Sequence, residues 1–195
     1  MDRLRLEFPT SIREKDAAEY IEEFYTHDSE LNGTGGLQRY MDNYSEWLNK
    51  LNNDLRQEPN EKRVPAETYF LVRESDNKIV GMINIRLALN HNLWNFGGHI
   101  GYSIRPSERK KGYNKINLYL ALNVCAMRGL KAVLLGCDKD NLGSSKTIQA
   151  LGGKMIYEYF DPEKDITIQN YVIDIEESLA KNKEQFSKLV AKYPE

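Results

Sequence analysis

The sequence has few of the residues that build disulfide frameworks or metal centres. It contains two cysteines and three histidines among its 195 residues. Cys125 and Cys137 both lie in apolar segments, so we expect buried free thiols in a reducing cytosol. The histidines His27, His91 and His99 show no spacing typical of a metal site. The sequence therefore predicts a cytoplasmic protein that needs no metal.

Long apolar runs are also missing. None approaches the about 20 apolar residues of a membrane-spanning helix. The segment Met1–Arg5 lacks the apolar core of a signal peptide. The net charge of −2 does not favour nucleic-acid binding, and neither the dinucleotide-binding glycine pattern nor the P-loop pattern occurs. We therefore expect a single domain over residues 1–195, with neither membrane nor nucleic acid as a partner.

The hydrophobic spacing that is present predicts a helical N-terminal part followed by strands that mostly form hairpins. Expected strands lie at about 4–6, 68–73, 79–87, 99–104, 132–137, 155–160 and 166–175. We expect one helix to begin at Ser11. Further helices are expected over about 37–57, 113–128 and 141–151, with a helical tail over 176–195. Ser11 and Glu14 have capping-box spacing, and residues 90–95 read as a loop.

The segment from Ile104 to Lys115 carries the most information about function. A strand ends there, a basic stretch follows, and a glycine precedes a helix. The basic residues are Arg105, Arg109, Lys110, Lys111 and Lys115, opposed only by Glu108. Unpaired backbone amides at a helix start suit a phosphate group, and Gly112 allows a ligand to approach the backbone closely. The pattern indicates either an anion site or a solvated basic loop.

Two motifs, one in the segment 104–115 and one at 141–153, resemble those of the GCN5-related N-acetyltransferase (GNAT) superfamily. Its acyl-CoA-binding segment reads Gln/Arg-x-x-Gly-x-Gly/Ala; Arg109 and Gly112 match it, whereas Asn114 departs from it. The segment 141–153 resembles the family's Asn-x-x-Ser/Ala…Gly-Phe helix, in which the asparagine contacts the pantetheine arm; the alternative is that Asn141 only caps a helix. The resemblance covers about 68–175.

The resemblance implies an α/β (α+β) fold, with a central, mixed and mostly antiparallel sheet of about seven strands flanked by helices. The fourth and fifth strands would part, and the pantetheine arm of acetyl-CoA would lie between them, near the backbone of Ile104. The implied acetyl-CoA-binding residues are Ile104, Arg105, Arg109, Lys110, Lys111, Gly112, Tyr113, Asn114, Asn141, Ser144 and Lys146.

The resemblance also implies direct attack of an amine on the acetyl thioester. The amine must lose a proton. His99 stands where many members carry a glutamate, and a histidine pKa of about 6.5 suits a base; a hydrogen-bonded histidine at a strand start and a substrate contact are the alternatives. Many members use a tyrosine to protonate the departing thiolate, but Ile148 occupies that position here. Tyr157, Tyr159 or water would take that role, and Tyr157 is the residue we name.

The acceptor is less well defined by the sequence. Arg86 and Asn90, which we name as candidate substrate-binding residues, belong to a string that resembles a bacterial branch of acetyltransferases. Arg86 is a candidate for binding a substrate carboxylate, with an exposed strand-end arginine as the alternative. We expect acetyl transfer to a primary amine of a small molecule. A homodimer is compatible with this expectation. A protein or peptide N-acetyltransferase and a catalytically silent CoA-binding regulatory module are the other interpretations.

Overall fold

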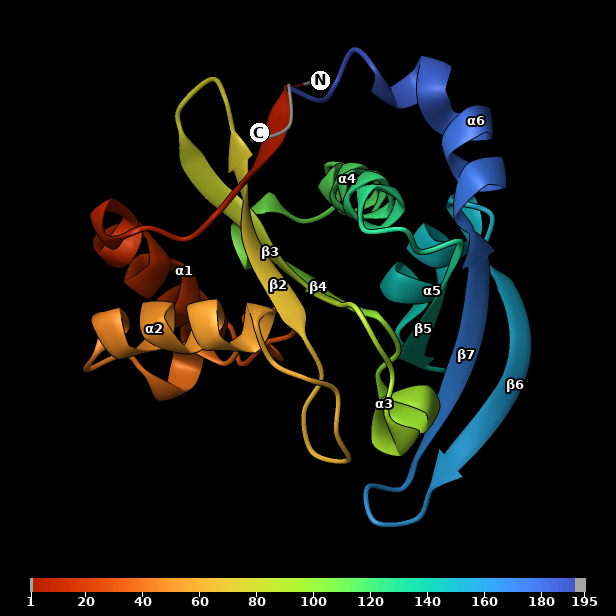
Figure 1. Cartoon of the computed structure of the whole chain (residues 1–195). Coiled ribbons are helices and arrows are strands. Elements are labelled where there is room, and N and C mark those ends of the chain that lie inside the picture. Colours follow the sequence, from red (N-terminus) through yellow and green to blue (C-terminus); the bar gives the residue numbers. More distant parts are fainter. Residues whose placement is uncertain (1, 192–195) are drawn as a thin grey trace.

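The computed structural model describes residues 2–191, which form two antiparallel sheets (Figure 1). The first sheet has the order β1-β2-β3-β4 and the second the order β5-β7-β6. The strands are β1 (Leu4–Glu7), β2 (Ala66–Arg73), β3 (Lys78–Arg86), β4 (Ile100–Ile104), β5 (Ala132–Asp138), β6 (Lys154–Asp161) and β7 (Ile166–Asp174). All of the predicted strands are confirmed, with shifts of a few residues at their ends.

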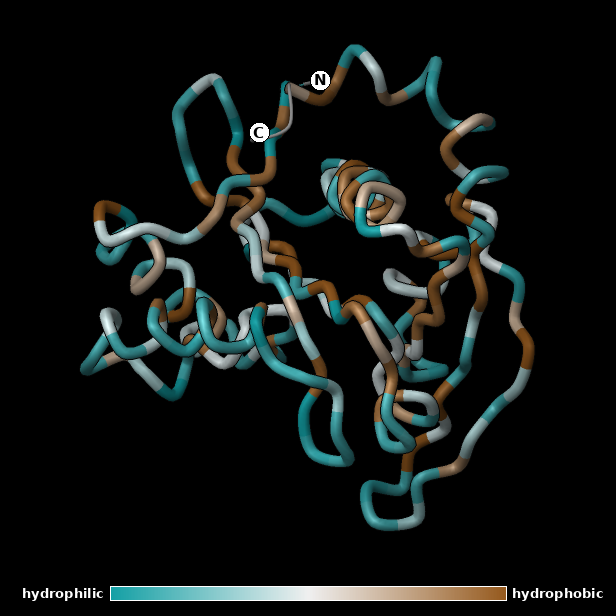
Figure 2. Tube along the Cα trace, in the orientation of Figure 1, coloured by the Kyte–Doolittle hydropathy of each residue, from teal (hydrophilic) through white to brown (hydrophobic). Residues whose placement is uncertain are grey.

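Helices cover both faces of the first sheet. The α-helices within residues 2–191 are α1 (Glu14–Thr26), α2 (Tyr44–Leu55), α3 (His91–Phe96), α4 (Tyr113–Met127), α5 (Leu142–Ala150) and α6 (Ile175–Phe186). Helices α1 and α2 pack on one face and α4 on the other (Figure 1). Each face has its own hydrophobic core, and the trace of α4 is largely apolar in Figure 2.

The alternation of side chains along β3 assigns its residues to these two faces. Ile83 and Ile85 belong to the core beneath α4, whereas Met82 belongs to the core beneath α1 and α2. Asn84 and Arg86 follow Met82 at every second position, so they lie on the face covered by α1 and α2. This placement puts Arg86 on the opposite side of the sheet from α4.

The two sheets meet at β4 and β5 and then separate. A single isolated bridge joins Gly98 to Leu135, and the backbone N–H of His99 donates to the carbonyl of Leu134 at 2.7 Å. Beyond that point the described residues of β4 and β5 form no ladder. The predicted parting of the fourth and fifth strands is therefore confirmed.

Three local predictions are wrong. The helix expected over 37–57 is a 3-10 turn at Leu37–Arg39 followed by α2. The helical pattern is interrupted before Asn43, which caps the start of α2 by accepting from the backbone N–H of Glu46. Ser11 opens a 3-10 turn without a side-chain cap, so no capping box forms. The expected loop at 90–95 contains the short helix α3.

The two ends of the described chain lie together beside β1 (Figure 1). The backbone N–H of Leu4 donates to Leu189, and that of Ala191 donates back to Leu4, each at 2.9 Å. The predicted C-terminal helix exists as α6, but it ends at Phe186, so residues 187–191 of the predicted helical tail are not helical; residues 192–195 lie outside the described residues. No helix within residues 2–191 is both long and apolar enough to cross a membrane.

Candidate functional site

A cavity of about 650 Å³ opens where β4 and β5 separate. Its walls come from four parts of the chain: the segment after α1, the end of β4, the basic loop before α4, and the start of α5. The cavity therefore joins the two segments in which the sequence predicted a cofactor site. Such a position, at a gap between sheet edges, is typical of ligand sites.

The basic loop presents unpaired backbone amides to this cavity. Among residues 2–191, no acceptor lies within hydrogen-bonding distance of the N–H groups of residues 110–114. Lys110 and Gly112 have positive φ angles of 63° and 80°, and α4 has no side-chain cap. Alternating left-handed residues before a helix turn successive N–H groups toward one point and create an anion-binding concavity.

Two of the predicted basic ligands are turned away from the cavity. Arg105 is buried and its Nε donates to Glu23 of α1 at 2.7 Å. Lys111 donates to Glu108 at 2.7 Å and is not among the lining residues. Arg109 does line the cavity, with its Nη2 donating to Ser29 at 2.7 Å. The prediction of Arg105 and Lys111 as direct cofactor ligands is therefore not supported by their contacts.

Glu108 holds the basic loop in place. It is buried and accepts hydrogen bonds from Arg73, Lys78 and Lys111. Burial alone raises the pKa of Glu108, but the hydrogen bonds from Arg73 and Lys111 outweigh it and lower the pKa to about 2. The carboxylate is therefore ionised throughout the neutral range, and the charge network around it preorganises the loop.

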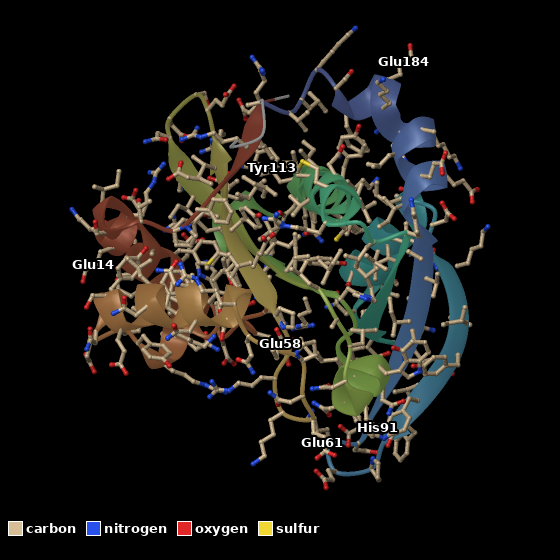
Figure 3. All side chains as sticks on the ribbon, in the orientation of Figure 1. Glu14, Glu58, Glu61, His91, Tyr113 and Glu184 are labelled. Carbon is tan, nitrogen blue, oxygen red and sulfur yellow. The ribbon has the colours of Figure 1, made fainter. Side chains whose placement is uncertain are left out.

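The first residues of α4 anchor the helix on two sides. The hydroxyl of Tyr113, labelled in Figure 3, donates to Asp2 at 2.7 Å. The side-chain amide of Asn114 donates to Thr147 of α5 at 3.5 Å, while its buried Oδ1 has no partner among the described residues. Both residues line the cavity. Asn114 thus replaces the small residue of the family motif with a bridge from α4 to α5.

The start of α5 forms the opposite wall. Asn141 caps α5 by accepting from the backbone N–H of Ser144 at 3.0 Å. The Ser144 hydroxyl shares a hydrogen bond of 2.8 Å with the hydroxyl of Tyr102 on β4. Both Asn141 and Ser144 line the cavity, whereas Lys146 is exposed and does not. The capping interpretation of Asn141 is confirmed, and it is compatible with a contact to a ligand in the cavity.

Tyr102 is one of the cavity residues that sequence reasoning did not name as site residues. Its strand pattern identified it only as part of β4. Burial raises the pKa of the Tyr102 phenol, so the hydroxyl is protonated at neutral pH. The signal that could have found it is the Gly-Tyr pair that follows His99, at the position where β4 leaves β5.

His99 joins the two sheets through its side chain. The backbone N–H of Leu134 donates to its Nδ1 at 2.9 Å, so the neutral ring carries its proton on Nε2 and offers no free acceptor. Burial, and to a lesser extent the charge of Arg86, lowers the pKa of His99. Its role as general base stays a prediction, and this geometry favours the alternative of a histidine hydrogen-bonded at a strand start.

Asn90 and Tyr157 lie outside the cavity. Asn90 caps α3 by accepting from Leu93, and it donates to the carbonyl of Glu61 at 3.0 Å; Figure 3 shows Glu61 close to His91 at the start of that helix. The hydroxyl of Tyr157 donates to the carbonyl of Trp94 at 2.6 Å. Neither residue is among those lining the cavity, so their predicted substrate and acid roles find no support in these contacts.

Two sheets that part between β4 and β5, with a cavity and a basic loop at the gap, define the architecture of the chain. The chain belongs to the acetyltransferase (GNAT) domain family, whose family model matches residues 3–154. It is an acyltransferase whose cosubstrate is acetyl-CoA. No curated protein matches the sequence. Within residues 2–191, no group of three or more histidine, cysteine, aspartate or glutamate residues is arranged to hold a metal ion.

Solved structures support the fold. RimJ of Mycobacterium smegmatis in complex with CoA-disulfide has a TM-score of 0.67 at 12% identity, covering 92% of each chain. A ribosomal-protein-S5-alanine acetyltransferase from Vibrio fischeri has a TM-score of 0.65 at 14% identity, covering 89% of this chain and 94% of its own. A chimera of spermidine N-acetyltransferase from Vibrio cholerae and hSSAT has a TM-score of 0.62 at 14% identity, covering 91% of this chain and 99% of its own.

Proposed function

We propose that this chain transfers the acetyl group of acetyl-CoA to a primary amine of a small molecule by direct attack. The observation that carries the proposal is the run of unpaired backbone amides at residues 110–114, which faces a cavity at the gap between β4 and β5. These amides suit a pyrophosphate group. Arg109 and Lys115 line the same cavity and add positive charge.

The remaining cavity walls fit the rest of a coenzyme. Asn114 lines the cavity at the start of α4, between the basic loop and α5. Asn141, Ser144 and Tyr102 continue the lining toward the parted strands, where a pantetheine arm would lie. Acetyl-CoA supplies the activated acetyl group. The residues of the chain orient this group and donate a proton to the departing sulfur.

Tyr102 is the proton donor in this proposal. The neutral amine attacks the acetyl carbonyl carbon, the carbon–sulfur bond breaks, and the sulfur takes the proton of the Tyr102 hydroxyl. The amine nitrogen releases its own proton to water, and Ser144 returns a proton to Tyr102 from solvent through their shared hydrogen bond. The phenol of Tyr102 is protonated at neutral pH, as a proton donor must be, although burial raises its pKa and so makes it a weaker acid.

His99 is expected to hold the strands rather than to accept the proton of the amine. His99→Phe leaves the N–H of Leu134 without its acceptor, so the free energy of unfolding should fall by about 1–3 kcal/mol. The folded-state pKa of His99 is lowered, so the unfolded chain binds more protons and wild-type stability declines as pH falls below about 6.5. That decline should be smaller in the variant. Urea denaturation between pH 5 and 8 measures both effects.

The pH profile of kcat/KM separates this positioning role from a base. A positioning role leaves a rising limb that shifts with the pKa of the amine used. If His99→Phe instead removes a limb that stays constant across amines, and stability is unchanged, His99 is the base.

The proposed function is tested by counting products. The full chain is incubated with acetyl-CoA and a panel of small amines, polyamines and peptides, while free CoA thiol and the acetylated product are quantified together. Equal amounts of both products with a small amine support the proposal. Transfer only to peptides would identify a protein acetyltransferase, and coenzyme binding without transfer to any amine would contradict catalysis.

A further inference from the structure

Arg86 is a partly buried cation without a carboxylate. No ion pair involving it occurs among residues 2–191, although the other arginines of low exposure all have one. Arg13 pairs with Glu7, Arg73 with Glu108, and Arg105 with Glu23. Burial lowers the pKa of the Arg86 guanidinium, yet arginine keeps its charge at neutral pH. The site therefore holds a positive charge that the chain itself does not neutralise.

The hydrogen bonds of Arg86 leave one edge of the guanidinium available. Nη1 donates to the carbonyls of Gly97 at 3.1 Å and Gly98 at 2.9 Å. Among the described residues, Nε and Nη2 have no acceptor. Neither atom is among the buried side-chain atoms that lack a partner, so both retain access to solvent. Two parallel N–H groups on Nε and Nη2 match the two oxygens of a carboxylate.

This free edge lies next to the cavity. A methyl group placed on Gly101 would be 3.2 Å from Nη2 of Arg86 and 3.5 Å from the backbone nitrogen of Gly33. Gly101 precedes Tyr102, and Gly33 follows Asn32; both neighbours line the cavity. The backbone N–H of Gly33 has no acceptor among the described residues either. An anion held by Arg86 would therefore lie beside the inner end of the coenzyme cavity, on the face of the sheet opposite α4.

We propose that Arg86 binds a carboxylate of the acceptor, so that the preferred acceptors are small amines that carry a carboxylate group. This inference rests on the proposed function, and it names the substrate class of the same site. A polyamine would bring further positive charge beside an uncompensated guanidinium, which is unfavourable at a partly desolvated position. The amine of a bound amino acid would instead be held close to the carboxylate contact.

The test compares amines that differ only in the carboxylate. Phenylalanine, leucine and methionine are each assayed beside their carboxamides and decarboxylated amines, with kcat/KM corrected for the fraction of neutral amine. Wild type should prefer the carboxylate member by about 10- to 100-fold, as expected for a charge-assisted hydrogen-bonded pair. Arg86→Met should remove this preference by lowering only the carboxylate rates. Arg86→Lys keeps the charge but not the paired donors, so it should give an intermediate preference.

Two controls make the result decisive. Arg63→Met removes an exposed arginine and should change nothing. Calorimetry with hydrocinnamate, a carboxylate without an amine, reports the anchor even if no acetyl transfer occurs: binding to wild type that weakens in Arg86→Lys and is lost in Arg86→Met supports it. Equal wild-type rates for all members of a set, or a preference that Arg86→Met leaves intact, would overturn the inference. Absence of transfer to every amine, with hydrocinnamate binding retained, would overturn the proposed function alone.

Discussion

Gly112→Glu is expected to raise the dissociation constant of acetyl-CoA by at least about 100-fold, which corresponds to a loss of about 3 kcal/mol of binding free energy. Gly112 has a φ of 80° and caps α4 between the unpaired amides of residues 110–114. A carboxylate at this position would accept from those amides and would repel a pyrophosphate. Calorimetric titration of the folded variant with acetyl-CoA measures the effect.

A matched control separates the carboxylate from the strain of the backbone. Gly129 follows the other end of α4 with a φ of 82°, and a Cβ there meets nothing within 4 Å. Gly129→Glu therefore carries the same left-handed strain as Gly112→Glu, without standing near the cavity. It should bind acetyl-CoA like wild type. Equal affinities in both variants would remove the basic loop from the coenzyme site.

Tyr102→Phe is expected to lower kcat by about 10²–10⁴-fold, which is the usual contribution of a general acid. The dissociation constant of acetyl-CoA should change little, because the ring still fills the cavity wall. Ser144→Ala removes the hydrogen-bond partner of the Tyr102 hydroxyl and should lower kcat by a smaller factor. Steady-state rates and calorimetry on the same preparations measure the two effects.

Tyr157→Phe is the control for this prediction. The Tyr157 hydroxyl binds the carbonyl of Trp94 and does not line the cavity, so kcat should stay near the wild-type value. The opposite pattern, with Tyr157→Phe slow and Tyr102→Phe near wild type, would restore the acid that the sequence predicted. Water would be the proton source if both variants kept wild-type kcat.

The basic loop with its unpaired amides could be predicted from the sequence because the pattern that produces it is local. A strand end, Gly112 and a helix start follow one another directly, and unpaired amides are a consequence of that order. The directions of the basic side chains depend on their partners, which the local sequence pattern does not reveal. Arg105 turns to Glu23 of α1 and Lys111 to Glu108, and neither partner is indicated by the spacing of the basic residues.

The contacts of Tyr102, the proposed acid, and of His99 depend on segments far apart in the chain. Tyr102 meets Ser144 across the gap between the sheets, and His99 meets the backbone of Leu134. Hydrophobic periodicity assigns a residue to a strand and a face, but it does not predict which residues meet across the gap between β4 and β5. For that reason the sequence identified His99 as a catalytic candidate and overlooked Tyr102.

Amide hydrogen exchange of the full chain, with and without saturating acetyl-CoA, tests the central claim most directly. Without ligand the amides of residues 110–114 have no acceptor among the described residues and should exchange rapidly. The account predicts that acetyl-CoA slows exchange strongly in this segment and at the start of α5. If calorimetry shows acetyl-CoA bound while residues 110–114 exchange as before, the coenzyme lies elsewhere and the account is contradicted.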